Sequence, residues 1–352
     1  MDLKRVGENL SFRNIGLIYI WIVEIAVFWI WTPSLFPTEN TIRAILNGYT
    51  LAGLAALAVL IPLVSGAIDA SVGGNISLTS VVCAWLLGST HLSVFVVVIL
   101  TLLVGAAIGL ANVFVVVVLE IPSIIGTLAI WLIADALSIA VSNNLVLSSS
   151  ALSGPFGTVF ALASWNNFTI PILYLLVLTV IIGVTLTQTP GGRYTYAVGL
   201  NPDVSRNAGI RVKWVQSRAL VIGGILGAFA GLALTAHVAS ASPQDGDSYL
   251  LPAFAAVFLG ATQFRAKRFN AWGTILAVFM LATGQYGLIL AGAPQWTPNV
   301  FQGVALIAAM GFSSMRGNTG LSKGRWRKFF RSSRHGSSGP SKQGVPDAAA
   351  LT

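Results

Sequence analysis

Charged side chains are scarce in this sequence, and their scarcity decides its class. Asp, Glu, Lys and Arg make up 9% of the 352 residues, whereas a soluble domain carries about 25%. A water-soluble fold could not cover its surface with so few charges, so the composition excludes a soluble globular domain. The apolar residues form long runs, each about long enough to cross a hydrocarbon core of roughly 30 Å. The sequence therefore predicts an all-α polytopic membrane protein.

Cysteine and histidine are almost absent as well. Cys83 is the only cysteine, which excludes an intrachain disulfide and a cysteine cluster. No His, Cys, Asp or Glu residues show the spacing of metal ligands, and the chain lacks a G-x-x-x-x-G-K-[ST] phosphate loop and a nucleophile elbow. We therefore expect no enzyme activity, no bound cofactor and no metal ion in this chain.

Ten apolar stretches are predicted to span the membrane. They lie at 15–36, 48–65, 72–89, 94–118, 123–141, 170–187, 216–238, 251–264, 271–292 and 299–315. Together they form one transmembrane domain (15–316) between an N-terminal segment (1–14) and a C-terminal tail (317–352). The tail is rich in Ser, Gly, Lys and Arg, a composition that cannot bury a core, so we expect it to be disordered.

Lys and Arg are distributed unevenly between the predicted loops. If the N-terminus is cytoplasmic, the ten-span topology places every Lys and Arg except Arg43 on the cytoplasmic side. Cytoplasmic loops carry an excess of these residues, so both ends are predicted to be cytoplasmic in a multi-pass protein of a bacterial inner membrane. The net charge of +9 is thus explained by the basic residues of the cytoplasmic loops and tail, and we expect no nucleic-acid partner. The basic, aromatic patch Arg325–Arg331 is predicted to rest on anionic lipid of the bilayer.

The stretch IPLVSGAIDASVGG (61–74) covers the end of the second predicted span, the break that follows and the start of the third span. Asp69 lies in this apolar setting, where a charge costs at least about 2.5–3.5 kcal/mol on insertion scales. One interpretation places Asp69 and Ser71 at a helix break on a solute pathway, where freed backbone groups need partners. The other makes Asp69 the cap of the third span. The pattern D-x-S-x-G favours the cap, and Asp69 can still shape a pathway from there.

Two other acids are predicted to lie inside spans: Glu24 in the first and Asp135 in the fifth. Intramembrane acids can form proton relays. Neither has a second acid or a His close by in the sequence, so a relay is not favoured. Glu120, in the short turn before the fifth span, is most simply an interfacial residue.

Uncharged polar residues in apolar spans are candidates for both helix packing and a sugar pathway. In lipid they must find hydrogen-bond partners, so packing between helices is the favoured interpretation. The candidates are Asn112, Thr127, Gln285 and Gln302. Glycines at every fourth position predict close helix pairs at Gly105 and Gly109 in the fourth span, and at Gly223, Gly227 and Gly231 in the seventh.

The predicted cytoplasmic loop 188–215 carries helix-ending and helix-starting residues. Pro190 and the two glycines after it are predicted to end the sixth span. Asn201 then opens a short helix at about 203–208, which Gly209 ends. A short helix beside basic residues suits a docking element for a cytoplasmic partner; the alternative is an ordinary basic loop.

Three stretches resemble the ribose-type carbohydrate ABC permease family. LIPLVSGAIDASVGG is similar to its ISGGIDLSVG signature, and NVFVVVVLEIPSIIGTL to its segment with IPPFIVTLG. GGRYTYAVGLNPDVSRNAGIRV is similar to its cytoplasmic loop, GRY.YAIGGN..AARLSGI.V. Order and spacing agree over nearly the whole membrane domain. Ala67 and Ala70 replace the family's usual Gly and Leu.

The resemblance implies the membrane subunit of an ATP-driven importer for a small carbohydrate or sugar-like solute. Its loop would supply the coupling helix for the ATPase, through Arg193, Tyr196, Asn201, Asp203, Arg206 and Gly209. The implied partners are a second permease subunit (identical or paralogous), a cytoplasmic subunit that binds ATP and Mg, and an extracytoplasmic solute-binding protein. The alternative is an ion-coupled secondary transporter, which would need broken helices or intramembrane carboxylates in both halves. The sequence shows such a position only at Asp69.

Overall fold

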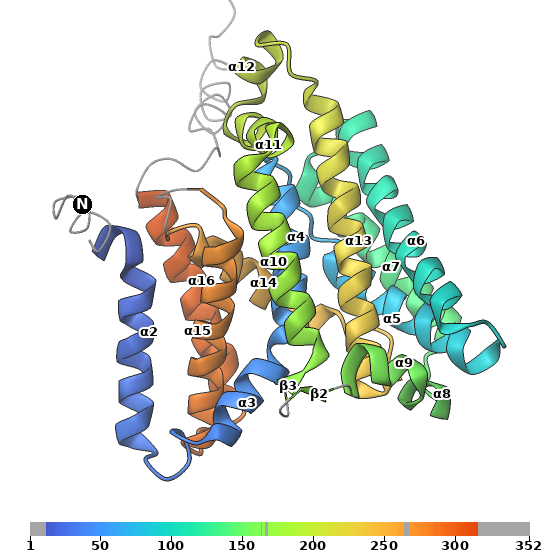
Figure 1. The fold of residues 1–352 in the computed structure, drawn as a ribbon. Coiled ribbons are helices and arrows are strands. Elements are labelled where there is room, and N and C mark those ends of the chain that lie inside the picture. Colours follow the sequence, from blue (N-terminus) through green and yellow to red (C-terminus); the bar gives the residue numbers. More distant parts are fainter. Residues whose placement is uncertain (1–11, 163, 166–167, 264–267, 316–352) are drawn as a thin grey trace, which may run out of the picture.

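The computed structural model describes residues 12–162, 164–165, 168–263 and 268–315. Most of the predicted N-terminal segment and the whole tail therefore lie outside the described residues. Each predicted span overlaps one of the long helices of the bundle (Figure 1), which are α2 (Phe12–Trp31), α4 (Thr50–Val64), α5 (Val72–Ser89), α6 (Val94–Val113), α7 (Ser123–Ser142), α10 (Ile170–Gln188), α13 (Val212–Val238), α14 (Asp247–Gly260), α15 (Ala271–Leu290) and α16 (Thr297–Met315).

Shorter elements connect the long helices. The helical ones are α3 (Glu39–Gly48), η1 (Phe114–Val118), α8 (Ser150–Ser153), α9 (Pro155–Gly157), η2 (Thr158–Leu162), α11 (Pro190–Leu200) and α12 (Pro202–Asn207). The strands are β1 (Leu147–Ser148), β2 (Ser164–Trp165), β3 (Phe168–Thr169) and β4 (Ser240–Ala241). β1 pairs antiparallel with β4, and β2 with β3. We call the end of the bundle with α11 and α12 the α12 end, and the opposite end the β end (Figure 1).

Seven helical stretches of the described chain are long and apolar enough to cross a membrane, which confirms an all-α, multi-pass protein. They are Glu39–Val64, Val72–Ser89, Val94–Val118, Ser123–Ser142, Ile170–Gln188, Val212–Val238 and Ala271–Leu290. The second predicted span starts too late, because α3 continues into α4 with only Tyr49 between them. Gly16–Trp31 and Asp247–Gly260 are apolar but shorter. The number of ten spans and the cytoplasmic ends remain predictions.

α13 is the central helix, and it packs against α4, α5 and α6. The glycines of α6 lie directly against it. Gly105 contacts Ala228 and the carbonyl of Gly224, and a Cβ atom at Gly109 would lie 2.7 Å from the Cα of Val221. There is therefore no room for a side chain on this face of α6, as in the small-residue contacts of membrane helices.

The three glycines that the sequence places on one face of α13 contact two different helices. Gly223 lies against α4, whereas Gly227 and Gly231 lie against Asn75 and Thr79 of α5. A central helix has neighbours on several sides, so a single glycine stripe serves more than one of them. The glycine that faces α6 is the neighbouring Gly224.

α5 begins halfway along the bundle. The chain leaves α4 at Val64 and turns at Gly66, whose φ of 85° favours glycine. Asn75, in the first turn of α5, donates a 2.8 Å hydrogen bond from Nδ2 to the carbonyl of Gly224, near the middle of the 27-residue α13. The turn between α4 and α5 is therefore buried at mid-depth, where every freed backbone group needs a partner.

α14 also begins at mid-depth. After α13 ends at Val238, β4 pairs with β1 at the β end and the chain turns back into the bundle. The N–H of Gly246 donates a 3.0 Å hydrogen bond to Ser77 Oγ of α5, and α14 starts at the next residue, Asp247. This geometry explains why the eighth predicted span is short. The expectation of an interrupted helix in only one half of the chain is wrong.

The segment 188–215 is more helical than the sequence suggested. α10 ends at Gln188, and Pro190 starts α11 after a single residue. Thr189 caps α11, because its Oγ1 accepts a 3.2 Å hydrogen bond from the N–H of Gly192. Proline is favourable at the first position of a helix, where its missing N–H is not needed. The residues that end α10 thus also begin α11.

Candidate functional site

Asp69 lies in the turn between α4 and α5 and is fully buried. Its Oδ1 accepts hydrogen bonds from the N–H of Ser71 (2.9 Å) and from the Ser71 hydroxyl (2.6 Å). Asn112 of α6 donates from Nδ2 to Ser71 Oγ at 2.7 Å and to Asp69 Oδ1 at 3.3 Å. The N-cap of α5 is Ser71, which makes no side-chain hydrogen bond to the first turn. Asp69 therefore holds the residue before the helix by a local side-chain bond, and the prediction that it caps the third span is wrong.

Side chains of α7 satisfy the rest of this turn. Ser123 Oγ accepts a 3.1 Å hydrogen bond from the N–H of Ile68, and Thr127 Oγ1 accepts one of 3.0 Å from the N–H of Ala70. Polar side chains therefore replace the hydrogen-bond partners that the interrupted helix lost. We call the four predicted residues that meet here the turn cluster: Asp69, Ser71, Asn112 and Thr127.

The other two candidate pathway residues lie elsewhere. Gln285 of α15 and Gln302 of α16 are half-buried, and no hydrogen bond links either of them to the turn cluster in the described part of the chain. Near them, the carboxyl of Glu24 in α2 lies against Gly284 of α15. The six predicted residues therefore do not form one site.

A second polar group at the same depth was not anticipated. Trp131 of α7 donates a 2.8 Å hydrogen bond from Nε1 to Asp247 Oδ1, at the start of α14. The carboxyl of Asp135, one turn further along α7, faces the side chains of Asp247, Gln244 and Ser77. One signal in the sequence pointed to this group: the eighth predicted span is short, and Asp247 directly precedes it.

The short helix at the α12 end forms as its sequence indicated. Asn201 Oδ1 accepts hydrogen bonds of 3.1 Å from the N–H groups of Asp203 and Val204, and Gly209 follows the helix with a φ of 82°. Arg206 lies 3.5 Å from the Asp203 carboxylate, and both side chains are exposed. The helix therefore presents a rigid, charged surface at the end of the bundle.

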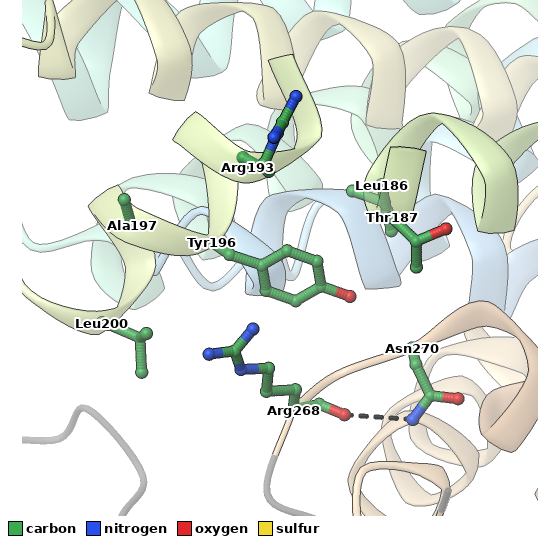
Figure 2. A pocket seen from close by; sticks show the side chains of 8 residues that line it. All are labelled: Leu186, Thr187, Arg193, Tyr196, Ala197, Leu200, Arg268 and Asn270. Carbon is green, nitrogen blue, oxygen red and sulfur yellow. Dashed lines mark hydrogen bonds between the residues drawn. The ribbon is translucent and has the colours of Figure 1, made fainter. Parts of the chain in front are cut away.

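α11 supports this helix and borders a hollow. Tyr196 donates a 2.6 Å hydrogen bond from its hydroxyl to the carbonyl of Phe269, and the Arg268 guanidinium lies 5.7 Å from the centre of its ring. Arg193 lies on the other side of the tyrosine in Figure 2. The hollow has a volume of about 270 Å³ and is lined by Leu186, Thr187, Arg193, Tyr196, Ala197, Leu200, Arg268 and Asn270.

α11 also contacts the turn between α4 and α5. Gly199 lies against the carbonyl of Val64, and a Cβ atom at Gly66 would lie 3.2 Å from the Cα of Gly199. Two backbones meet here without side chains between them, so a displacement of α11 would reach this turn directly. The turn cluster begins three residues further along the chain.

Comparison with known proteins identifies the family of this bundle. The chain is 28% identical to the ribose import permease protein of Bacillus subtilis (strain 168) over 309 residues, which cover 88% of this chain and 95% of that protein. It is 29% identical to the autoinducer 2 import system permease protein of Photorhabdus laumondii subsp. laumondii over 313 residues, or 84% and 92% of the two chains. With the fructose import permease protein of Rhizobium meliloti it shares 27% identity over 285 residues, 79% of each chain.

No solved structure matches the chain. The model of one protein family, the permease component of the branched-chain amino acid transport system, matches residues 41–310. This range holds the turn cluster, α11, α12 and both helices that start at mid-depth. The protein therefore belongs to this family of transport permeases.

Proposed function

We propose that this chain is the membrane-spanning subunit of an ATP-driven importer for a small carbohydrate or sugar-like solute. The ribose and fructose import permeases among its relatives support the substrate class. The autoinducer 2 import permease widens that class to other small polar solutes. The side chains at mid-depth suit such a solute, because hydroxyl, amide and carboxyl groups bind sugar hydroxyls.

The proposal includes ten spans with both ends in the cytoplasm. Basic residues support this orientation. The elements at the α12 end (Figure 1) carry Arg193 (α11), Arg206 (α12) and Lys213 (first turn of α13), and Arg268 lies beside Tyr196 of α11. Arg43 belongs to α3, which lies toward the β end. The α12 end would therefore face the cytoplasm. The β end would face the outside, where a solute-binding protein delivers its bound solute.

The proposed partners follow from the same family. A second permease subunit would complete the pathway, and a separate cytoplasmic subunit would bind ATP and Mg and hydrolyse the nucleotide. The residues for contact with that subunit are Arg193, Tyr196, Asn201, Asp203, Arg206 and Gly209, which lie on α11 and around α12. The hydrogen-bonded caps of α12 support this role, because a docking element must keep its shape under load.

One observation carries the proposed mechanism: Gly199 of α11 lies backbone to backbone with the turn at Gly66. A partner that moves α12 would move α11, and α11 would push the turn that holds Asp69. The bundle has few charges to restrain such a movement. The contact therefore links a cytoplasmic movement to the polar groups at mid-depth.

The test is uptake in cells that carry this chain together with its neighbouring genes. We expect permease-dependent accumulation of a labelled pentose or hexose that requires ATP and persists when ion gradients are collapsed. Loss of uptake on collapse of a gradient while ATP is maintained would overturn the ATP-driven proposal.

An ion-coupled secondary transporter is the second candidate, and one observation favours it. Asp135 and Asp247 face each other at mid-depth, and paired intramembrane carboxyl groups can hold a coupling proton or ion. Solute uptake into vesicles that contain an ion gradient but no nucleotide would support this candidate over the first.

A further inference from the structure

The starts of α5 and α14 meet at mid-depth around Trp131 of α7. Gly73, in the first turn of α5, lies so close that a Cβ atom there would be 3.4 Å from Asp247 Oδ1 and 3.5 Å from Trp131 Nε1. The glycine therefore leaves room for the pair of side chains that joins α7 to α14. These three helices come from different parts of the chain, and their polar groups converge at one point.

One atom in this group lacks a partner. Asp135 is 8% exposed, and its Oδ1 is buried without a hydrogen-bond partner among the described residues. A buried acceptor that lacks a donor destabilises the fold unless something supplies one. Asp247 cannot supply one while it is ionised, because a carboxylate only accepts. Gln244 and Ser77 face the same carboxyl group, but the Oδ1 atom still lacks a donor. A hydroxyl group of a bound molecule would supply that donor.

The loop that leads into α14 supports a binding role. Gln244 has a φ of 71°, a left-handed conformation that is unfavourable for a residue other than glycine. Such conformations persist where the surrounding structure enforces them, and they occur often at ligand-binding sites. The conformation brings the Gln244 amide to the carboxyl of Asp135, so the group contains both a donor and acceptors.

We infer that Trp131, Asp135, Gln244 and Asp247 form the binding site for the hydroxyl groups of a small sugar or polyol. The carboxyl groups accept from hydroxyls, the Gln244 amide both donates and accepts, and the indole of Trp131 offers an apolar face to the ring carbons. The hydrogen bond from Trp131 to Asp247 fixes the orientation of both side chains. This inference rests on the proposed function and names the residues that recognise its substrate.

The experiment measures binding to the full-length permease, purified in lipid nanodiscs, without any transport partner. The melting temperature is recorded with and without D-ribose, D-xylose or D-fructose at millimolar concentrations. A ligand that binds only the folded state raises the melting temperature by mass action. We expect at least one of the three sugars to raise that of the wild type by a few degrees.

Two conservative variants locate the binding. Asp135→Asn and Asp247→Asn keep the size of the side chains but change the acceptors, and both should lose most of the sugar-induced rise. Trp131→Phe, which removes the N–H donor and keeps an aromatic ring, should show a smaller sugar-induced rise than the wild type. The matched control is Asp245→Asn: Asp245 lies in the same loop, and its carboxyl accepts a 2.9 Å hydrogen bond from the N–H of Ser242.

Sugars also stabilise proteins non-specifically, because they are excluded from protein surfaces. That effect would be equal in all variants, and an equal rise in all of them would overturn the inference. The absence of any rise in the melting temperature of the wild type would also overturn the inference, because no sugar would then bind at Asp135 Oδ1. ATP-dependent uptake in cells can succeed in either case, so failure of this site is distinguishable from failure of the proposed function.

Discussion

Lys213 Nζ donates a 2.7 Å hydrogen bond to Glu120 Oε1 and thereby joins the first turn of α13 to the turn between η1 and α7. Glu120 has a φ of 56°, so its backbone is held in a left-handed conformation at this point. The hydrogen bond and the positive charge of Lys213 lower the pKa of the Glu120 carboxyl. The pair ties α7, which carries Thr127 and Trp131, to the chain that follows α12.

This ion pair predicts a defined pH dependence. Because the pKa of Glu120 is lower in the folded state, its stabilising effect is present above the unfolded pKa and disappears as the pH falls through the folded pKa. Lys213→Met should therefore lower the melting temperature slightly. The difference from the wild type should stay constant from neutral pH down to about 4.3, the pKa of an unperturbed glutamate. The effect is small because the pair is exposed. Lys213→Arg is the control, and a difference that grows on acidification would contradict the assignment.

The contact between α6 and α13 should not tolerate a side chain. Gly105→Leu would place a side chain against backbone atoms of α13, which cannot move aside as a flexible side chain can. Overpacking of this kind costs typically about 1–3 kcal/mol, and more where backbone must shift. We expect a lower yield of monodisperse protein in size-exclusion chromatography. Gly303→Leu is the matched control, because nothing lies within 4 Å of a Cβ atom at Gly303 in α16. Equal yields of the two variants would contradict the predicted packing.

The orientation of the bundle can be tested by cysteine labelling. Cys83 is buried and should stay silent, so single cysteines can be added to the chain directly. Asn207→Cys, at the exposed end of α12, should react with an impermeant thiol reagent only in permeabilised cells. His91→Cys, in the exposed turn after α5, should react in intact cells. Labelling of Asn207→Cys in intact cells, and of His91→Cys only after permeabilisation, would show that the predicted orientation is inverted.

The sequence predicted features that depend on neighbouring residues. The long apolar runs predicted the helices, and Asn201 and Gly209 predicted both ends of α12, because caps and left-handed turns are local properties. It did not predict that Asp247 faces Asp135, since the two residues meet only through the fold. Trp131 and Asp247, which form the hydrogen bond beside it, are 116 residues apart.

The depth of α14 was missed for a related reason. An apolar helix of 14 residues has the same composition whether it lies at an edge of the membrane or starts at its centre. Its position is set by a tertiary contact, the hydrogen bond from Gly246 to Ser77 in α5. The helix at 190–200 is not predicted either, because Pro190 can end one helix and also begin the next, and its sequence does not say which.

The coupling role of α12 leads to the most direct prediction. Gly209→Val keeps the space around the residue open, because nothing lies within 4 Å of a Cβ atom there. The cost is therefore confined to the backbone, since a β-branched residue resists the φ of 82°. Strain of this kind costs of order 1–3 kcal/mol and should change the end of α12 without unfolding the bundle. The variant should insert and dimerise normally but lose substrate-stimulated ATP hydrolysis.

Ala208→Val is the matched control, because the same side chain is added one residue earlier at a negative φ of −82°, without the left-handed conformation of Gly209. Arg206→Glu tests the charge of the same surface: it reverses an exposed guanidinium, and like charges across an interface can cost several kcal/mol. We expect Gly209→Val and Arg206→Glu to reduce co-purification of the ATPase subunit, and Ala208→Val to retain it. If both variants keep full coupled uptake, α12 does not transmit the force of ATP hydrolysis. The contact between Gly199 and Gly66 would then be ordinary helix packing.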